Sequence, residues 1–128
     1  MEFDSTTPIY VQIAEDIRHS ILIGALEDGD KVMSTTEYAT ASRINPATAA
    51  KAFAALVDEG LLVKRRGIGM FVAEGARGRL RAAGRTGFIA DSFLPVVEEG
   101  LALGIPADDF IDAIRVRAAG VRDFDKEH

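Results

Sequence analysis

Apolar side chains recur every three or four positions along much of the chain, which is the period of an amphipathic helix. The first predicted helix has Pro8 at its first helical position and ends at Gly24. Its apolar face is made of four isoleucines, Ile9, Ile13, Ile17 and Ile21. Such a face is stable only when it is buried, so we expect this helix to pack against the core of a folded domain.

Two further helix starts follow in the sequence. Ser34 and Glu37 have the spacing of a capping box, which begins a short second helix. The segment "SRINP" interrupts that helix, and Asn45 followed by Pro46 begins a third helix that runs to Gly60. The buried stripe predicted for the third helix is Ala49, Ala50, Phe53, Leu56 and Val57.

Strand-like segments come next, at residues 61–66 and 70–73, joined across Gly67, Ile68 and Gly69. Glycines that flank a single residue suit a tight hairpin loop with positive φ angles. Another short strand is predicted at residues 31–33. Two helices joined by a tight turn and followed by a hairpin form a winged helix-turn-helix. The predicted fold class is mainly α with a small β-hairpin, and we assign this domain to residues 1–75.

Residues 76–128 form a second predicted segment, a short helical module. Its first part, "RGRLRAAGR", is a linker or the frayed start of a fourth helix. Helices are predicted at 88–103, with a kink at Pro95, and at 106–118, and the tail after Gly120 is expected to be loose. The apolar positions of these two helices are Phe88, Ile89, Phe93, Val96, Val97, Leu101, Phe110, Ile111 and Ile114.

The apolar stripe of this two-helix module needs a partner surface. Two helices of this length cannot enclose a cavity of several hundred Å³ by themselves, although Phe88 and Phe93 are aromatic residues that a ligand pocket could use. We therefore expect the stripe to be buried against a second copy of the chain in a twofold homodimer. A small-molecule effector, if the protein has one, is then expected at the dimer interface.

Charge is distributed unevenly over a chain whose net charge is −5. Residues 64–85 hold seven Lys and Arg side chains against one Glu, whereas the segments before and after them are acidic. A polyanion responds to the local field of such a patch over about 8–10 Å, and not to the net charge of the whole protein. The overall acidity therefore does not exclude a nucleic-acid partner.

The third helix has the properties of a DNA-reading element. An α-helix fits the major groove of DNA, and its N-terminal residues meet base edges and phosphates. We expect Thr48 and Asn45 to contact bases, and Arg43 and Lys51 to contact phosphates. The complete set of candidates at this end of the helix is Arg43, Asn45, Pro46, Ala47, Thr48 and Lys51.

The hairpin supplies a second group of candidate contacts. Its cations are expected to hold phosphates along the DNA backbone, and its two glycines allow the tip to approach the minor groove closely. The candidates are Lys64, Arg65, Arg66, Gly67 and Gly69.

The stretches "PIYVQIAEDIRHSILIGALEDGDKVMST" and "INPATAAKAFAALVDEGLLVKRRGIGMFV" lie within residues 8–72 and resemble the DNA-binding domain of the GntR family of bacterial transcription regulators. The stretch "FIADSFLPVVEEGLALGIPADDFIDAI" at 88–114 is similar to the C-terminal module of the YtrA subfamily, which implies a dimerisation element. The family pattern implies DNA contacts at the start of the second helix, in residues 43–51 and in the wing at 64–69. The resemblance thereby adds Ser34, Thr35, Thr36 and Ile68 to the candidates.

Two of these positions depart from the family pattern. Thr36 stands where the family usually has an arginine, and Ile68 stands where a cation is frequent at the wing tip. The absence of two cationic contacts lowers the salt-dependent, sequence-independent part of the affinity for DNA. The hydroxyls of Thr35 and Thr36 still donate hydrogen bonds to phosphate, but as neutral contacts these are weaker.

The sequence therefore predicts a homodimeric transcription regulator, a repressor, that binds a pseudo-palindromic DNA operator. The alternative is a winged-helix protein-interaction module that has lost DNA binding, which Thr36, Ile68 and the acidic remainder of the chain would fit. No enzyme activity, cofactor or metal site is expected, because there is no Cys and the acidic cluster at 108–112 lacks histidine partners. The absence of Cys and of any long apolar run leads us to expect a cytoplasmic protein.

Overall fold

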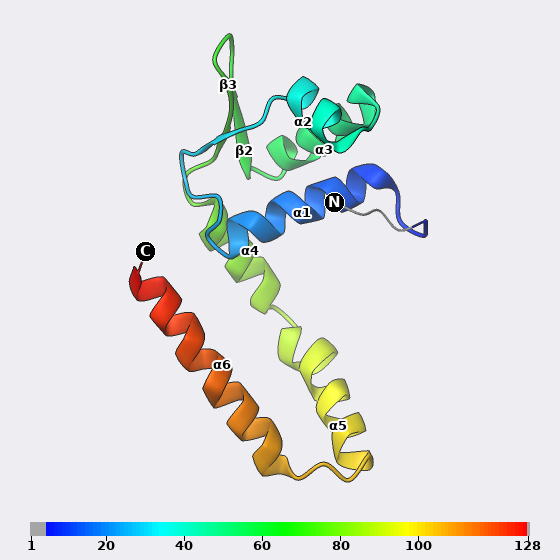
Figure 1. Ribbon diagram of the computed structural model, residues 1–128, viewed down its shortest axis with the longest axis vertical. Coiled ribbons are helices and arrows are strands. Elements are labelled where there is room, and N and C mark those ends of the chain that lie inside the picture. Colours follow the sequence, from blue (N-terminus) through cyan, green and yellow to red (C-terminus); the bar gives the residue numbers. More distant parts are fainter. Residues whose placement is uncertain (1–4, 128) are drawn as a thin grey trace. The chain divides into compact units, whose positions relative to one another are not determined.

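The computed structural model describes the chain from Ser5 to Glu127, with its side chains as far as Val121 (Figure 1). The chain divides into two compact units, residues 1–84 and residues 85–128.

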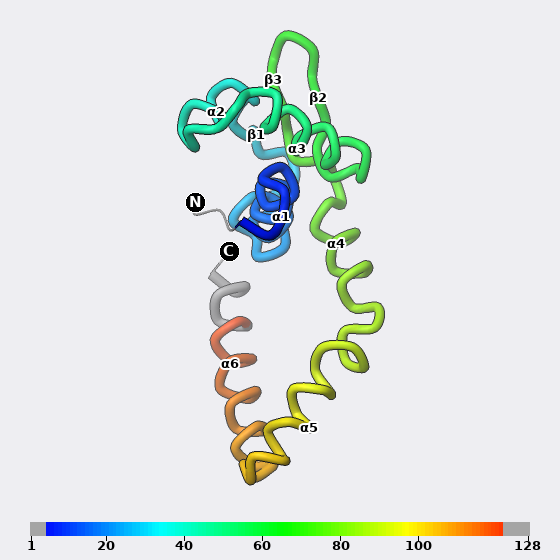
Figure 2. The backbone as a smooth tube through the Cα atoms, turned by 90° about the vertical axis from the view of Figure 1, so that its right-hand side faces the viewer, coloured from blue at the N-terminus to red at the C-terminus, as the bar shows by residue number. Residues whose placement is uncertain are grey.

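The first unit is a winged helix-turn-helix followed by a further helix, in the segment where the sequence predicted a linker or the frayed start of a fourth helix. Its helices are α1 (Ile9–Leu22), α2 (Thr35–Ser42), α3 (Pro46–Asp58) and α4 (Ala76–Arg85), and its strands are β1 (Lys31–Val32), β2 (Leu62–Arg65) and β3 (Gly69–Val72). Figures 1 and 2 show the three helices α1 to α3 grouped together, with the β2–β3 hairpin extending beyond them. The fold class expected from the sequence is confirmed.

The sheet has three antiparallel strands in the order β1-β3-β2. Strand β3 is central, with Phe71 opposite Lys31 on one side and opposite Val63 on the other. Because β1 lies 40 residues before its partner in the chain, the sequence pattern identified a short strand there but not its place in the sheet. Pairing with β3 places Lys31 beside the hairpin.

The core of the first unit is formed mainly between α1 and α3. Ile13 and Ile21 of α1 and Leu56 of α3 are completely buried, and Phe53 is 2% exposed. The Arg18 guanidinium also joins the two helices by donating to both carboxylate oxygens of Glu59, at 2.6 and 2.9 Å. This hydrogen-bonded carboxylate raises the pKa of Arg18. The isoleucine face predicted for α1 is thus the face that packs, apart from Ile9, which is 40% exposed.

The buried stripe of α3 differs from the predicted one in three positions. Ala49, Phe53 and Leu56 are buried as expected, but Ala50 is exposed and Val57 is 37% exposed, whereas Ala52 is completely buried. Residues 49, 52, 53 and 56 follow the spacing i, i+3, i+4 and i+7, which is one face of an α-helix. The predicted stripe was too wide because Ala50 and Val57 are apolar residues that lie next to that face.

Helix α4 corrects the interpretation of "RGRLRAAGR" as a linker or a frayed segment. It begins at the completely buried Ala76, and Leu80 packs against the core. The Arg77 Nε atom donates to the carbonyl oxygen of Leu22 at 2.9 Å, and the Arg79 Nη1 atom donates to that of Gly60 at 2.8 Å. These carbonyls lie at the C-terminal ends of α1 and α3, where backbone acceptors lack partners and the helix dipole is negative. Both arginines therefore stabilise helix ends.

The second unit consists of a π-helical turn at Ile89–Phe93, α5 (Leu94–Ala102) and α6 (Ala107–Glu127). The π-helical turn lies directly before Pro95, where the sequence predicted a kink, because proline cannot donate the next helical hydrogen bond. Figures 1 and 2 show α5 and α6 meeting at their connecting loop and diverging away from it. Helix α6 continues to Glu127, so the expected loose tail after Gly120 is wrong over that range.

The contact between α5 and α6 depends on a glycine. Gly100 is the buried residue of α5, and the Phe110 ring of α6 occupies the space that a Cβ atom at position 100 would need. The half-buried Phe110 therefore rests directly on the α5 backbone. This fixes the two helices near their loop and leaves their more distant side chains uncovered.

Substitutions at two neighbouring residues of α3 test which face of this helix is buried. We expect Leu56→Ala to lower the free energy of unfolding by about 2–5 kcal/mol, because it opens a cavity in the core. Val57→Ala is expected to cost less than about 1 kcal/mol, because that side chain is partly in solvent and alanine favours the helix. Urea unfolding of the full chain followed by circular dichroism measures both values. Equal costs for the two variants would contradict the assignment of the buried face.

Candidate nucleic-acid interface

The N-terminus of α3 is capped by Asn45 and is exposed to solvent. The Asn45 Oδ1 atom accepts a hydrogen bond from the Ala47 N–H at 2.8 Å, and Pro46 occupies the first turn. Ala47 is exposed and Thr48 is half-buried. This end carries the positive pole of the helix dipole and small side chains, which suits a close approach to phosphates and base edges. Because capping uses the side-chain oxygen of Asn45, the NH₂ group of this exposed side chain remains a donor.

The turn between α2 and α3 is made by an unusual backbone conformation at Arg43. This residue has a φ of 55°, in the left-handed region, and it closes α2 as its C-cap. The Arg43 N–H donates to the Thr40 carbonyl oxygen at 3.3 Å, and the Ile44 N–H donates to that of Ala39 at 3.0 Å. The turn therefore places the exposed Arg43 side chain two residues before the cap of α3, where the sequence predicted a phosphate contact.

The start of α2 is ordered in the same way. The Ser34 side chain accepts a hydrogen bond from the Glu37 N–H at 3.1 Å, as the capping box predicted. Thr35 is half-buried and Thr36 is exposed. Both helix-turn-helix helices thus begin with a polar cap whose side-chain oxygen accepts from the backbone, which leaves the other first-turn N–H groups available to an anion.

The β2–β3 hairpin is a wing with cations along one strand and a glycine-flanked tip. Lys64, Arg65 and Arg66 are all exposed, and the Arg65 guanidinium lies 4.7 Å from the centre of the Phe71 ring. Gly67 has a φ of 77° and Gly69 one of 143°, angles that side chains rarely adopt. Ile68 between them is 62% exposed. The predicted set of wing residues therefore lies together on a protruding hairpin.

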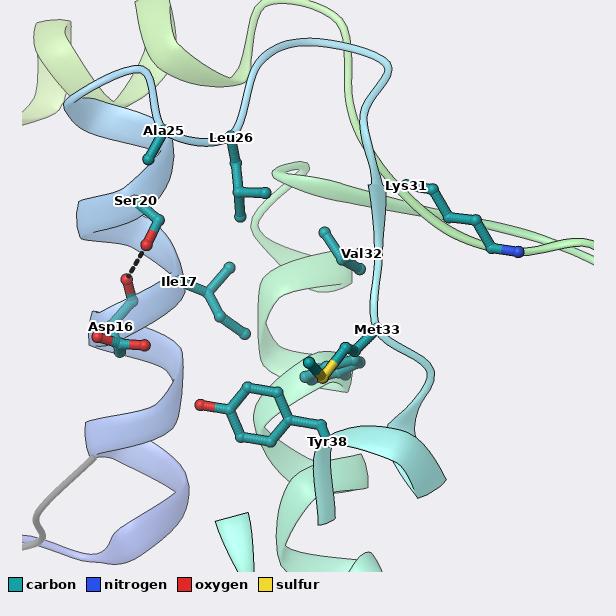
Figure 3. A pocket seen from close by; sticks show the side chains of 10 residues that line it. Asp16, Ile17, Ser20, Ala25, Leu26, Lys31, Val32, Met33 and Tyr38 are labelled. Carbon is teal, nitrogen blue, oxygen red and sulfur yellow. Dashed lines mark hydrogen bonds between the residues drawn. The ribbon is translucent and has the colours of Figure 1, made fainter. Parts of the chain in front are cut away.

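Lys31 is a further cation of the wing that the sequence reasoning missed. A Cβ atom on Gly69 would lie 2.9 Å from the Lys31 Cε atom, so the lysine stem crosses the hairpin at Gly69. Figure 3 shows this side chain pointing away from α1 and along the strands. The sequence feature that could have pointed to Lys31 was the short strand predicted at 31–33. Its pairing with β3 is a tertiary contact, which residue spacing does not reveal.

Lys51 and the cations of residues 64–85 do not form one uniform basic patch. The Lys51 ammonium lies 4.1 Å from the centre of the Tyr10 ring of α1, which fixes the side chain while leaving it exposed. Of the seven cations counted in residues 64–85, three lie on the wing or its tip, while Arg77 and Arg79 bind the C-terminal carbonyls described above. The remaining two, Arg81 and Arg85, are exposed on α4, so the basic segment is divided into groups with different surroundings.

The predicted dimer-interface residues lie on the second unit. Most are exposed, and Phe93, Val97 and Phe110 are half-buried. The exposed fraction is 65% for Val96 and 49% for both Leu101 and Ile114. An apolar face of this size on a two-helix unit is a surface that needs a cover. The exposed members of the set are Phe88, Ile89, Val96, Leu101, Ile111 and Ile114.

Other kinds of site find no support in the part of the chain that the structure describes. No group of three or more His, Cys, Asp or Glu side chains among those residues is arranged to hold a metal ion. No helix within the same range is both long and apolar enough to cross a membrane.

Comparisons with known proteins agree with this geometry. The family described as "Bacterial regulatory proteins, gntR family" matches residues 9–72, which run from α1 to β3. The HTH-type transcriptional repressor YtrA of Bacillus subtilis (strain 168) is 30% identical over 118 residues, which cover 92% of this chain and 90% of that protein. The resemblance to YtrA therefore extends over both units.

Solved structures show the same relationship. A GntR family transcriptional regulator from Listeria monocytogenes has a TM-score of 0.67 and 30% identity, over 88% of this chain and 97% of its own. The DNA-binding domain of AraR, solved in complex with operator ORR3, has a TM-score of 0.52 and 30% identity, over 57% of this chain and 88% of its own. These relatives are transcription regulators and not enzymes. The chain therefore belongs to the gntR family of bacterial regulatory proteins and is a transcription regulator with a DNA-binding helix-turn-helix.

Proposed function

We propose that this regulator is a homodimeric repressor that binds a pseudo-palindromic operator in double-stranded DNA. The observation that carries the proposal is the combination of an open α3 N-terminus with a cationic, glycine-tipped wing on the same unit. The AraR domain that shares this fold was solved on an operator, which supports DNA as the partner. The resemblance to a repressor over both units supports the direction of regulation.

The contacts divide into two chemical classes. Thr48 and the side-chain amide of Asn45 are proposed to meet base edges, because they project from the first turn of α3. Arg43, Lys51 and the wing cations are proposed to hold phosphates, which position the protein without reading sequence. The start of α2, at 34–36, adds hydroxyl and N–H donors to the phosphate class.

The second unit is proposed to pair with that of another copy. Twofold pairing covers the apolar side chains of α5 and α6 and presents two α3 helices to one duplex. Half-sites are then expected about 34–36 Å apart, or a multiple of that spacing. Selection of genomic DNA fragments by the full-length protein yields the operator and its spacing together. The alternative, a protein-interaction module without DNA binding, predicts that no fragment is enriched.

The wing cations are tested by removing two of them. The double variant Arg65→Ala with Arg66→Ala is expected to bind operator and random DNA more weakly by a similar factor. The slope of log affinity against log salt concentration should also become shallower, by about 0.9 for each phosphate that the variant no longer neutralises. Titration of labelled DNA at several salt concentrations measures both effects.

Two controls belong to this test. Arg81→Ala with Arg85→Ala removes the same charge from exposed positions of α4 and should change the slope much less. Replacing Arg65 and Arg66 by lysine keeps the charge and should recover most of the affinity, which separates electrostatics from the packing of Arg65 on Phe71. If the α4 variant matches the wing variant, the effect comes from net charge and the wing assignment is wrong.

Thr48 is tested as a base contact. Thr48→Ala is expected to lower the ratio of operator to random affinity by about fivefold, the effect of one hydrogen bond, with little change in the salt slope. Competition between selected genomic fragments and random DNA measures the ratio. Ala54→Ser, at an exposed position of α3 outside the candidate contacts, serves as the control for a small change in the same helix. A change in the salt slope with no change in the ratio would place Thr48 among the phosphate contacts.

Dimerisation is tested at two exposed positions. Leu101→Glu with Ile114→Glu is expected to convert a dimer to a monomer at micromolar concentration, because both side chains are about half exposed in the single chain and become buried on pairing. Analytical ultracentrifugation measures the mass. Ile23→Glu, at a residue of the first unit that is 46% exposed, controls for the added charge. An unmodified chain that sediments only as a monomer would rule the interface out.

A further inference from the structure

The first unit contains a cavity of about 410 Å³ that the proposed DNA contacts do not use. It lies between α1, β1 and α2 (Figure 3), and Phe53 of α3 is also among its lining residues. Its volume falls within the range of about 300–1,000 Å³ that is usual for small-molecule sites. Most of its lining is apolar and includes Ile17, Leu26, Val32 and Met33.

The polar groups of the cavity are few, and two of them lie on the side formed by α1. Asp16 and Ser20 of α1 line that side, and the Ser20 hydroxyl donates to the Asp16 backbone carbonyl at 3.1 Å. Tyr38 of α2 lies opposite, and Figure 3 shows its hydroxyl pointing toward α1. The pKa of Tyr38 is raised, first by burial and then by the negative charge of Asp16, while a hydrogen bond with the Ser42 side chain lowers it in part.

The charge of the lining is therefore negative at the polar side. Lys31 also lines the cavity, but its ammonium group lies 3.7 Å from the position of a Cβ atom on Gly69, on the hairpin. The Tyr38 ring is itself fixed, since it meets the Phe53 ring edge-on at 5.6 Å. An aromatic face held near a carboxylate is an arrangement that attracts an organic cation.

We propose that this cavity binds a small organic cation with an apolar body. The apolar walls would cover the body, while the Asp16 carboxylate and the Tyr38 ring would receive the ammonium group. A neutral molecule of the same shape would lack the attraction to Asp16, and an anion would be repelled by it. The site lies in the first unit, whereas the sequence predicts any effector at the dimer interface.

The position of the cavity connects it with the DNA-contacting elements. Met33 of its wall directly precedes Ser34, the cap of α2, and Lys31 at its edge reaches the wing. A cation held between α1 and α2 would change how α2 sits against α3, and operator affinity would change with it. This second step rests on the proposed function, whereas binding of the cation does not.

Binding is tested on the full chain without DNA, using 2-phenylethylammonium as the probe. Labelled methionine methyl groups report on the site, because Met33 lines the cavity and Met70 on β3 does not. We expect the Met33 signal to shift in a saturable manner while the Met70 signal stays. 2-Phenylethanol, the neutral analogue, should bind at least tenfold more weakly, and phenylacetate should bind less well still.

Matched variants locate the charge that the probe recognises. Asp16→Asn should remove the preference for the cation over the alcohol, whereas Glu15→Gln, one residue earlier and outside the lining, should keep it. Thermal unfolding confirms that each variant is folded. The proposal is overturned if millimolar probe leaves Met33 unchanged, if cation and alcohol bind equally, or if the two variants behave alike.

The link to DNA is read separately, by titrating operator with and without the cation. A changed operator affinity supports the coupling, and an unchanged one overturns the coupling while leaving the binding result intact. Loss of DNA binding under all conditions would instead count against the proposed function.

Discussion

The packing of Phe53 determines the arrangement of the whole helix-turn-helix. This ring is 2% exposed, lies in the core with the isoleucines of α1, and meets Tyr38 of α2 edge-on. One side chain of α3 thus contacts the core formed with α1 and also contacts α2, so the direction of α3 is set by its buried face. The opposite face and the N-terminal turn are then left in solvent. Removing so large a buried aromatic ring typically costs about 3–5 kcal/mol, a large share of the stability of a small domain.

An acidic chain can present a cationic surface because its wing cations are separate from the arginines that bind backbone carbonyls. Arg77 and Arg79 donate to carbonyls at the C-terminal ends of α1 and α3, where the helix dipoles are negative. The wing cations lie on β2 and at the hairpin tip, and β2 itself contains no acidic residue. Two acidic residues before β1 have structural roles as well: Asp28 accepts from the Gly75 N–H, and Asp30 accepts from the Glu27 N–H. The electric field near the wing is therefore positive although the net charge of the chain is negative.

Much of the fold could be predicted from the sequence because its local signals are strong. The caps at Ser34 and Asn45 accept the backbone hydrogen bonds that their spacing predicts. The GntR and YtrA resemblance is confirmed by the family match and by the relatives, and it correctly indicated a regulator. The candidate contact residues remain predictions, although the structure shows how Ser34, Asn45, Lys51 and Arg65 are held.

What escaped prediction depends on contacts between distant segments. Lys31 joins the wing only through the pairing of β1 with β3, and Arg77 reaches a carbonyl 55 residues earlier in the chain. The helical period alone locates the buried face of α3 only to within about one residue on either side. Whether Ala52 or one of its apolar neighbours is buried depends on where α1 packs. Helix α6 passes Gly120 because glycine in a helix costs only about 1 kcal/mol relative to alanine, which a long helix tolerates.

The two neutral positions, Thr36 and Ile68, make the second unit more important to the proposed function. Each cation that is absent from the phosphate contacts lowers the number of counterions released at a half-site by about one. The affinity of that half-site for DNA is therefore weaker, most strongly at low salt. A single unit with this surface would then bind DNA weakly. Linking two units makes the second binding event intramolecular, at an effective concentration in the millimolar range for a short connection, which compensates for the missing cations without any new contact. The exposed apolar side chains of α5 and α6 are therefore proposed to supply, through pairing, affinity that the wing and α2 do not supply by charge.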